Sequence, residues 1–550
     1  VSDGGFMYLN YEQQLSKLTL KQRSVVENTN VVSPIRIDGP AGTGKTASMI
    51  LRAYFLLKNA RAKAEPFSIV FFAHSESTKC EIESAFSLLE NADSFLSEKS
   101  SQHIMFTTLF AYCIKTIRVN SSQVIEHDAN DAKQSQRILI EEAFDKVYKE
   151  KFRTFKPLLS GELCKVFDTQ VTPKGVMISM LQHEFSIQIK GRTDCTIEEY
   201  YQIPRISNAL PVETQKDKEF VFSIFLEYQN MLRISSVYDI DDITVQALAQ
   251  WNAPIWRRER RDSGFDYIFV DEMHLFNINE QHVFHYLTKS AEQKQIPICF
   301  ALDYGQAIGD RGNTNRDYIE TAFGEVERND YKTVFRCSQQ ITDFCAAISA
   351  SGALMFQNDY RDPYDIAASG FTQQEEAVCD IPRLYMYSNE EEMIESLKGH
   401  VDRFKQETQC KNYDIALISF EDTLLIPQNV EKLSSLLGKK MYVLKNRQTS
   451  SLSRSIKTDD PIILSDPYNV NGLEFKCVIL FGVDEGRLPQ NTGVSDISAN
   501  YIKYIAFNQL YLASSRAKYR LILIGNSLHG VSSCLQYALE SGKLETGDQV

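Results

Sequence analysis

The stretch that most constrains the fold of this chain is residues 39–46, which have the form G-x-x-x-x-G-K-T. An apolar run at residues 33–38 precedes it and suits a short buried strand, and residues 47–54 suit a helix. A glycine-rich turn between a strand and a helix lets backbone N–H groups surround phosphate oxygens, and the helix N-terminus adds a partial positive charge. The sequence therefore predicts an α/β domain that binds a nucleoside triphosphate.

The residues of this turn have separate expected roles. Gly39, Gly42 and Gly44 allow the backbone to fold around phosphate. Lys45 is expected to reach the β- and γ-phosphates, and the hydroxyl of Thr46 is expected to ligate Mg²⁺. The alternative is a chance glycine-rich turn, but the strand and helix on either side favour the phosphate loop.

A second motif supplies two carboxylates. The apolar run at residues 265–270 ends in Asp271 and Glu272. Behind a phosphate loop, Asp271 is expected to hold Mg²⁺ through water, and Glu272 to polarise the attacking water. The next apolar run, residues 296–303, leads to Gln306, which can sense a γ-phosphate. These residues indicate hydrolysis of the triphosphate.

Between the two motifs, the pattern of apolar residues changes from strand-like runs to helical spacing. Strand-like runs at residues 67–73 and 104–110 extend the first predicted sheet. From about residue 121 to 256, apolar residues recur at helical spacing, which predicts a mostly helical insertion. The insertion ends near an acidic cluster at residues 238–243. For this cluster, the N-cap and first turn of a helix is favoured over a metal site.

The C-terminal part predicts a second α/β unit that has no phosphate loop of its own. Its strands are expected at residues 413–419, 461–465, 477–482 and 520–525. Arg336 and Arg516 belong to this unit. A second sheet that supplies arginines is expected where ATP lies between two lobes, because arginines stabilise the charge that develops on the transferred phosphate.

Composition limits the partners and the compartment. The net charge of −13 excludes a surface coated with basic residues, but it permits a local basic groove for nucleic acid. For the densest basic run, residues 257–261, a solvated loop is the preferred interpretation and a phosphate contact is the alternative. Eleven scattered cysteines without a C-x-x-C pair disfavour zinc and iron–sulfur sites and fit a reducing, cytoplasmic compartment.

Neither a membrane span nor a leader peptide is expected. No apolar run reaches the ~20 residues that a membrane-spanning helix needs. Residues 1–5 lack the basic and apolar pattern of a signal peptide, and Val1 in place of Met indicates that the chain was trimmed.

Taken in this order, the motifs resemble the UvrD/Rep-like (PcrA-like) branch of superfamily 1 helicases over nearly the whole chain. The matching stretches are residues 39–46, 73–78, 108–112, 271–274, 302–308, 335–338, 471–475 and 509–518. The resemblance implies that ATP and Mg²⁺ are the cofactors. It implies that Gln22 reads adenine, that Phe335 stacks on it and that Glu474 binds the ribose. It assigns catalysis to Glu272, Lys45, Arg336, Arg516 and Gln306.

The resemblance also implies a fold, two RecA-like parallel-sheet lobes with a mostly helical insertion in the first. The expected domains are 1A at residues 1–115 and 251–325, the insertion 1B at residues 116–250, and 2A at residues 326–550. Between the strand near Phe420 and the motif at residues 471–475, only about forty residues remain ahead of the strand expected at residues 461–465. The accessory domain 2B is therefore expected to be absent or reduced to a loop, because domains run upward of ~50 residues.

The implied function is ATP-driven translocation on single-stranded DNA or its unwinding, in the 3′→5′ direction, in DNA repair, recombination or genome defence. The expected partner is single-stranded nucleic acid, DNA ahead of RNA, with a nuclease or repair factor as a further protein partner and no membrane. Two alternatives stay open. The chain is a nucleic-acid-stimulated NTPase that serves as a motor subunit or remodels proteins, or it is an ATP-switched binding module that does not unwind.

Three departures from the family pattern bear on this function. His274 stands where the family has Gln, which affects the coupling between ATP and nucleic acid, and Ala47 stands where an Arg flanks adenine. Residues 307–312 lack the aromatic side chains that stack on single-strand bases, a contact worth ~1–3 kcal/mol per base. Other aromatic residues considered for that contact, each with core packing as the favoured interpretation, are Phe110, Tyr112 and Tyr468.

Overall fold

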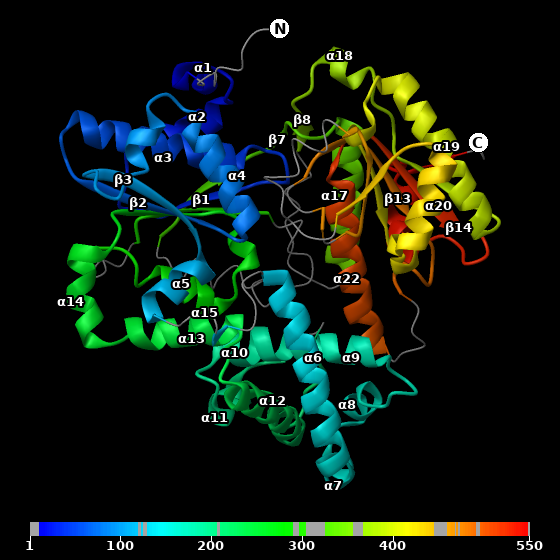
Figure 1. Ribbon diagram of the computed structural model, residues 1–550, viewed down its shortest axis with the longest axis horizontal. Coiled ribbons are helices and arrows are strands. Elements are labelled where there is room, and N and C mark those ends of the chain that lie inside the picture. Colours follow the sequence, from blue (N-terminus) through cyan, green and yellow to red (C-terminus); the bar gives the residue numbers. More distant parts are fainter. Residues whose placement is uncertain are drawn as a thin grey trace. The chain divides into compact units, whose positions relative to one another are not determined.

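The structure is a computed structural model in which two compact units are distinguished (Figure 1). It describes residues 10–118, 123–124, 129–205, 209–289, 296–303, 325–355, 367–444, 459–467, 469–470, 473–490 and 496–547. The first unit comprises residues 1–38, 45–302 and 310–331. The second comprises residues 39–44, 303–309 and 332–550.

The first unit is built on a six-stranded sheet in the order β3-β2-β4-β5-β1-β6, in which every pair is parallel. The strands are β1 (Ile35–Asp38), β2 (Phe67–Ala73), β3 (Gln102–Thr108), β4 (Tyr267–Val270), β5 (Ile298–Leu302) and β6 (Glu327–Asp330). β1, β4 and β5 are buried along their whole length. This burial explains why β4 and β5 are uninterrupted apolar runs in the sequence and why the two charged residues of β1 pair with each other. The five strands expected from the sequence are confirmed, and β6 is an addition at the edge.

Helices connect these strands. They are α1 (Tyr11–Ser16), α2 (Leu20–Val26), α3 (Lys45–Ala62), α4 (Glu76–Ser87), α5 (Leu109–Ile117), α14 (Pro254–Ser263) and α15 (Ile278–Phe284). The stretch before the phosphate loop holds two helices, and Thr19 caps the second of them, α2, through a reciprocal side-chain and backbone pair with Gln22. One expectation is corrected here. The basic run at residues 257–261 lies in helix α14 and is not a loop.

The insertion between β3 and β4 is helical, as expected. Its helices are α6 (Ala129–Val147), α7 (Arg153–Phe155), α8 (Gly161–Val166), α9 (Lys174–His183), α10 (Lys190–Arg192), α11 (Ile197–Gln202), α12 (Gln215–Ser235) and α13 (Ile240–Trp251). The two longest, α6 and α12, pack against each other. A π-helical turn, Glu184–Ile189, leads from α9 into α10. Such turns displace the residues that follow them around the helix axis.

The displaced residue of interest is Lys190, whose side chain is fully buried. Its Nζ lies 2.6 Å from Oδ2 of Asp239 and 2.7 Å from Oδ1 of Asp242. Asp239 is also the N-cap of α13 and accepts a hydrogen bond from the Asp242 N–H, so the acidic cluster is a helix start, as favoured from the sequence. Burial lowers the pKa of Lys190, but the two carboxylates outweigh burial and raise it above its ordinary value.

The second unit is built on a seven-stranded parallel sheet in the order β11-β12-β10-β13-β14-β9-β15. Its strands are β9 (Arg383–Tyr387), β10 (Ile415–Ser419), β11 (Met441–Val443), β12 (Ile462–Ser465), β13 (Phe475–Phe481), β14 (Ala517–Asn526) and β15 (Glu545–Thr546). A small separate sheet pairs β7 (Thr333–Val334) with β8 (Ala368–Ser369). The four strands expected from the sequence form the centre of the large sheet, and the additions are short or lie toward its edges.

Helices of the second unit pack in pairs, α17 beside α22 and α19 beside α20 (Figure 1). The helices of this unit are α17 (Gln339–Met355), α18 (Gln373–Glu376), α19 (Glu390–Thr408), α20 (Pro427–Leu437), α22 (Asp496–Ser514) and α23 (Gln536–Glu540). The two parallel sheets and their connecting helices confirm the α/β fold class, and the helical insertion belongs to the first unit. The division into 1A, 1B and 2A with their boundaries, and the reduction of 2B, stay predictions.

The buried charges of Lys190, Asp239 and Asp242 generate a prediction for Lys190→Met. The substitution leaves two buried carboxylates without their cation, so we expect the free energy of unfolding to fall by ~3–5 kcal/mol. Urea denaturation followed by circular dichroism measures it. Lys146→Met is the matched control, because Lys146 makes an ion pair with Glu227 on the surface and its loss should leave the transition unchanged. Equal effects of the two substitutions would contradict this account.

Glu184 generates a prediction about pH. Burial raises the pKa of Glu184 from 4.5 to about 7, against the opposing effects of the Tyr200 hydroxyl, 2.6 Å from Oε1, and of Lys218. A carboxyl whose pKa is raised by folding stabilises the folded state when protonated, so its favourable contribution is lost as the pH rises from about 4.5 to about 7. Glu184→Gln, which keeps an acceptor for Tyr200, should therefore gain about 3 kcal/mol relative to the wild type between pH 5 and pH 8. Urea denaturation at both pH values measures this, with exposed Glu198→Gln as the control. Parallel pH profiles for Glu184→Gln and the wild type would contradict it.

Candidate nucleotide site

The glycine-rich turn has the backbone geometry that its sequence requires. Gly42 and Gly44 have φ angles of +82° and +75°, the left-handed region that residues with a Cβ adopt at a cost. The Thr43 hydroxyl donates a 2.9 Å hydrogen bond to the Pro40 carbonyl and tightens the turn. Helix α3 begins at Lys45, whose side chain is buried. The strand, turn and helix expected around residues 39–46 are therefore present.

The turn is joined to the carboxylate motif by one hydrogen bond. The hydroxyl of Thr46 donates to Oδ2 of Asp271 over 2.8 Å. Asp271 follows β4 directly and its backbone N–H donates to the Phe72 carbonyl of the neighbouring strand, which fixes its position. A hydroxyl and a carboxylate are hard oxygen ligands of the kind that Mg²⁺ prefers, so these two residues could hold it.

The electrostatics of Asp271 are those of a cation site. Burial, together with the neighbouring Glu272 carboxylate, raises the pKa of Asp271 to about 7. The Thr46 hydroxyl and the charge of Lys45 act in the opposite direction. A divalent cation would favour the charged carboxylate that burial disfavours, so the donor set fits the expected metal.

Glu272 lies in an unusual backbone conformation. Its φ and ψ are 51° and 49°, the left-handed region, which costs about 1–3 kcal/mol for a residue other than glycine. Its Oε2 lies 3.3 Å from Nε2 of His274, the residue that departs from the family pattern. The side chain of His274 is buried. The departure therefore places an imidazole directly against the carboxylate expected to polarise water.

In the second unit the structure brings three of the expected residues together. Nε of Arg336 donates to Oε1 of Glu474 over 2.7 Å. Arg516 is fully buried, and its guanidinium donates to the carbonyl of Leu512 and the hydroxyl of Ser515. Burial, together with the nearby charge of Arg336, lowers the pKa of Arg516 to about 10. Two guanidiniums near one carboxylate form a site with an excess of positive charge, suited to a polyphosphate.

Backbone hydrogen bonds tie the C-terminal motifs together. The Phe475 N–H donates to the carbonyl of Arg516 over 2.9 Å, and the Ser338 N–H donates to the carbonyl of Lys518 over 3.0 Å. These contacts join stretches that are far apart in the chain. They explain why Arg336, Glu474 and Arg516 meet although none is close in sequence to another.

Phe335 presents an aromatic ring to solvent, with 41% of the residue exposed. A Cβ on Gly370 would lie 2.6 Å from its ring, so only glycine permits this close packing. The Phe335 N–H donates to the carbonyl of Gly42, and both residues belong to the second unit. An exposed ring held from beneath is suited to stacking on a base.

Other expected residues are engaged differently or lie outside the described part of the chain. Oε1 of Gln22 accepts the Thr19 N–H in the cap of α2, so adenine recognition through that oxygen would have to break the cap. Tyr112 packs in the core, where its ring stacks on Trp251 and meets Phe72 edge to face. Gln306, Tyr468 and residues 471–472 are not among the described residues.

One buried ion pair on β1 was not expected from the sequence. Nε of Arg36 donates to Oδ1 of Asp38 over 2.7 Å, and both side chains lie inside the first unit. Burial raises the pKa of Asp38, against the charge of Arg36. The alternation of a cation and an anion two residues apart on one strand places both on the same face, which is the signal that could have revealed the pair.

The described residues hold neither a membrane-spanning candidate nor a further metal cluster. No helix among them is long and apolar enough to cross a membrane. Within the same part of the chain, no group of three or more histidine, cysteine, aspartate or glutamate side chains could hold a metal ion.

Comparison with known proteins identifies the family. No curated protein matches the chain. Similar solved structures include the C-terminal domain of a possible DNA helicase from Lactobacillus plantarum WCFS1, with 16% identity, a TM-score of 0.26 and coverage of 39% of this chain and 99% of that one. That likeness is too low to support an argument. The family described as UvrD/REP helicase N-terminal domain matches residues 18–310, more than half of the chain. The resemblance seen in the motifs is thereby confirmed, and the chain belongs to the UvrD/REP helicase family.

Proposed function

We propose that the protein is an ATP-driven translocase on single-stranded DNA that moves in the 3′→5′ direction. The family is one of ATP-hydrolysing DNA helicases, which supports the broad activity. The observation that carries the proposal is the hydrogen bond between Thr46 and Asp271, with Lys45 and Glu272 next to them in the chain. This arrangement sets a phosphate loop against a pair of carboxylates, as hydrolysis of a triphosphate requires.

The residues of the first unit divide the chemistry among them. Lys45, at the start of α3, would bind the terminal phosphates of ATP, and Thr46 and Asp271 would hold Mg²⁺. When bound, Mg²⁺ neutralises the charge that develops on the phosphates. Glu272 would orient the attacking water, with Nε2 of His274 3.3 Å from its Oε2. Gln306 is proposed as the sensor of the γ-phosphate.

The residues of the second unit act on the leaving and transferred phosphates. Arg336 is paired with Glu474, so binding of ATP must exchange this ion pair for contacts with phosphate and ribose. Arg516 is held by backbone and hydroxyl acceptors and needs no such exchange. Phe335 and Gln22 are proposed to hold the adenine. The exchange at Arg336 gives nucleotide binding a means to alter the second unit.

The cellular setting is part of the proposal. All eleven cysteines are free, which suits a reducing cytoplasm. DNA repair, recombination and genome defence each need such a motor, and a nuclease or a repair factor is the expected protein partner. A motor subunit without unwinding activity and an ATP-switched binding module are the alternatives that the following measurement separates.

ATP hydrolysis measured with and without single-stranded DNA and RNA tests the function. We expect DNA to stimulate hydrolysis more than RNA, and movement along a strand to displace a bound streptavidin from one end only. The Lys45→Ala protein should lose hydrolysis, since ~2.7–4 kcal/mol of transition-state stabilisation corresponds to about a 10²- to 10³-fold fall. Absence of stimulation by either nucleic acid would overturn the translocase. Hydrolysis by Lys45→Ala at the wild-type rate would overturn the site.

Glu474→Gln tests the ribose contact and the ion pair together. A carboxylate that binds the ribose should make the enzyme prefer ATP over 2′-deoxyATP, and the amide should reduce that preference about tenfold, since a charged hydrogen bond is worth ~1.5–3 kcal/mol. The ratio of kcat/KM for the two nucleotides measures it. Glu540→Gln, on the surface of the same unit, is the control. An unchanged ratio in Glu474→Gln would remove the ribose from the role of Glu474.

A further inference from the structure

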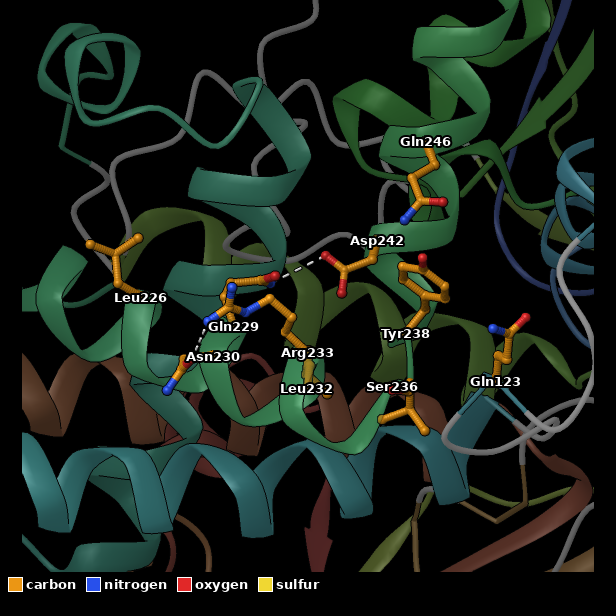
Figure 2. A pocket seen from close by; sticks show the side chains of 11 residues that line it. Gln123, Leu226, Gln229, Asn230, Leu232, Arg233, Ser236, Tyr238, Asp242 and Gln246 are labelled. Atoms are coloured by element: carbon orange, nitrogen blue, oxygen red, sulfur yellow. Dashed lines mark hydrogen bonds between the residues drawn. The ribbon is translucent and has the colours of Figure 1, made fainter.

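A cavity of about 620 Å³ lies in the helical insertion, between the end of α12 and the start of α13 (Figure 2). Its volume falls within the ~300–1,000 Å³ typical of small-molecule sites. Its lining includes Arg233, Tyr238 and Asp242 and the carboxamides of Gln123, Gln229, Asn230 and Gln246. None of these residues belongs to the nucleotide site.

The lining has the chemistry that recognises a heterocyclic base. Four of its side chains are carboxamides, each of which offers a donor and an acceptor side by side. Tyr238 adds an aromatic ring, and Arg233 a planar cation on an exposed residue. Single-stranded nucleic acid is recognised by the same means, with bases stacked on aromatic or guanidinium planes and hydrogen-bonded along their edges.

Several walls of the cavity are held in place. Nε2 of Gln229 donates to Oδ1 of Asp242 over 3.2 Å, and Arg233 donates to Oδ1 of Asn230 over 2.9 Å (Figure 2). The backbone N–H of Tyr238 donates to the Gln123 carbonyl over 2.7 Å. A site whose groups are already positioned loses little conformational entropy on binding.

The charge of the cavity favours a polyanion at its rim. Asp242 is paired with the buried Lys190 over 2.7 Å, so its negative charge is compensated beneath the cavity. Arg233 donates to a neutral amide rather than to a carboxylate, so its charge is not cancelled by that contact. The rim therefore carries a cation next to a base-sized space, which matches a nucleotide within a strand.

Two of the places considered for base stacking elsewhere in the chain do not supply an available ring. Residues 307–312 carry no aromatic side chain for base stacking, and Tyr112 is packed in the core. We propose that the cavity between α12 and α13 binds one unpaired base of a nucleic-acid strand, with Tyr238 stacked on it, carboxamides on its edge and Arg233 on a flanking phosphate. This inference rests on the proposed function, because it requires that the protein binds a single strand.

Fluorescence anisotropy with labelled oligonucleotides tests the cavity. The probes are an oligothymidylate and an abasic strand of equal length, so they share the phosphates and differ in the bases. Tyr238→Ala should weaken binding of the oligothymidylate about tenfold and leave binding of the abasic strand unchanged, since loss of one stacking contact costs ~1–3 kcal/mol. Tyr238→Phe keeps the ring and should bind both probes as the wild type does.

A second variant and a matched control complete the design. Arg233→Ala should weaken both probes alike and reduce the salt dependence by about one phosphate contact. Tyr537→Ala removes an exposed tyrosine of the second unit and should change neither probe. Circular dichroism of each variant establishes that it is folded.

The outcomes separate the two proposals. Binding of the oligothymidylate by Tyr238→Ala as tight as that of the wild type overturns the base site, as does an equal loss for both probes. A wild-type protein that binds neither probe and whose ATP hydrolysis is unstimulated overturns the translocase and the base site together. Wild-type binding and stimulation with an unchanged Tyr238→Ala overturns the base site alone.

Discussion

The hydrogen bond between Thr46 and Asp271 is the contact on which the proposed chemistry of the first unit depends. The two residues are 225 positions apart in the chain, and the helical insertion accounts for much of that separation. The parallel sheet brings them together, because β1 and β4 are both paired with β5 and end at the same edge. The insertion can therefore be large without disturbing the site, since it leaves and returns to the sheet beside β2.

The second unit holds two arginines, Arg336 and Arg516, whose positive charges are compensated in different ways. Arg516 is buried, and its pKa is lowered to about 10, but its guanidinium donates to the Leu512 carbonyl of α22 and to the Ser515 hydroxyl. Arg336 is compensated by Glu474, a residue expected to bind the nucleotide itself. One arginine is thus fixed in advance, and the other is released only by exchange. Preorganisation and response to ligand are divided between two side chains.

Much of this arrangement could be predicted from the sequence, because buried parallel strands are continuous apolar runs and their polar ends mark the site. Residues 67–73 form a strand with those bounds, and Asp271 and Glu272 follow another. The remainder depended on interactions that sequence patterns do not encode. The break at Thr19 comes from a cap, and the pair between Arg336 and Glu474 joins residues 138 positions apart. Short edge strands such as β11 bury too little to show a pattern.

The buried Lys190 has a consequence for how the protein opens. Its carbonyl accepts a 2.8 Å hydrogen bond from the side chain of Asn279, in the helix that follows the carboxylate motif. The next residue, Gly191, is so close to Ser186 and Asn277 that a Cβ would lie 2.8 Å from a carbonyl oxygen. The insertion is therefore joined to the segment that follows β4 by a side-chain hydrogen bond and by close packing, while the buried charges hold the insertion itself together. Insertion and sheet should behave as one cooperative folding unit, in which amide hydrogens at the base of the insertion are as protected from exchange as those of the sheet.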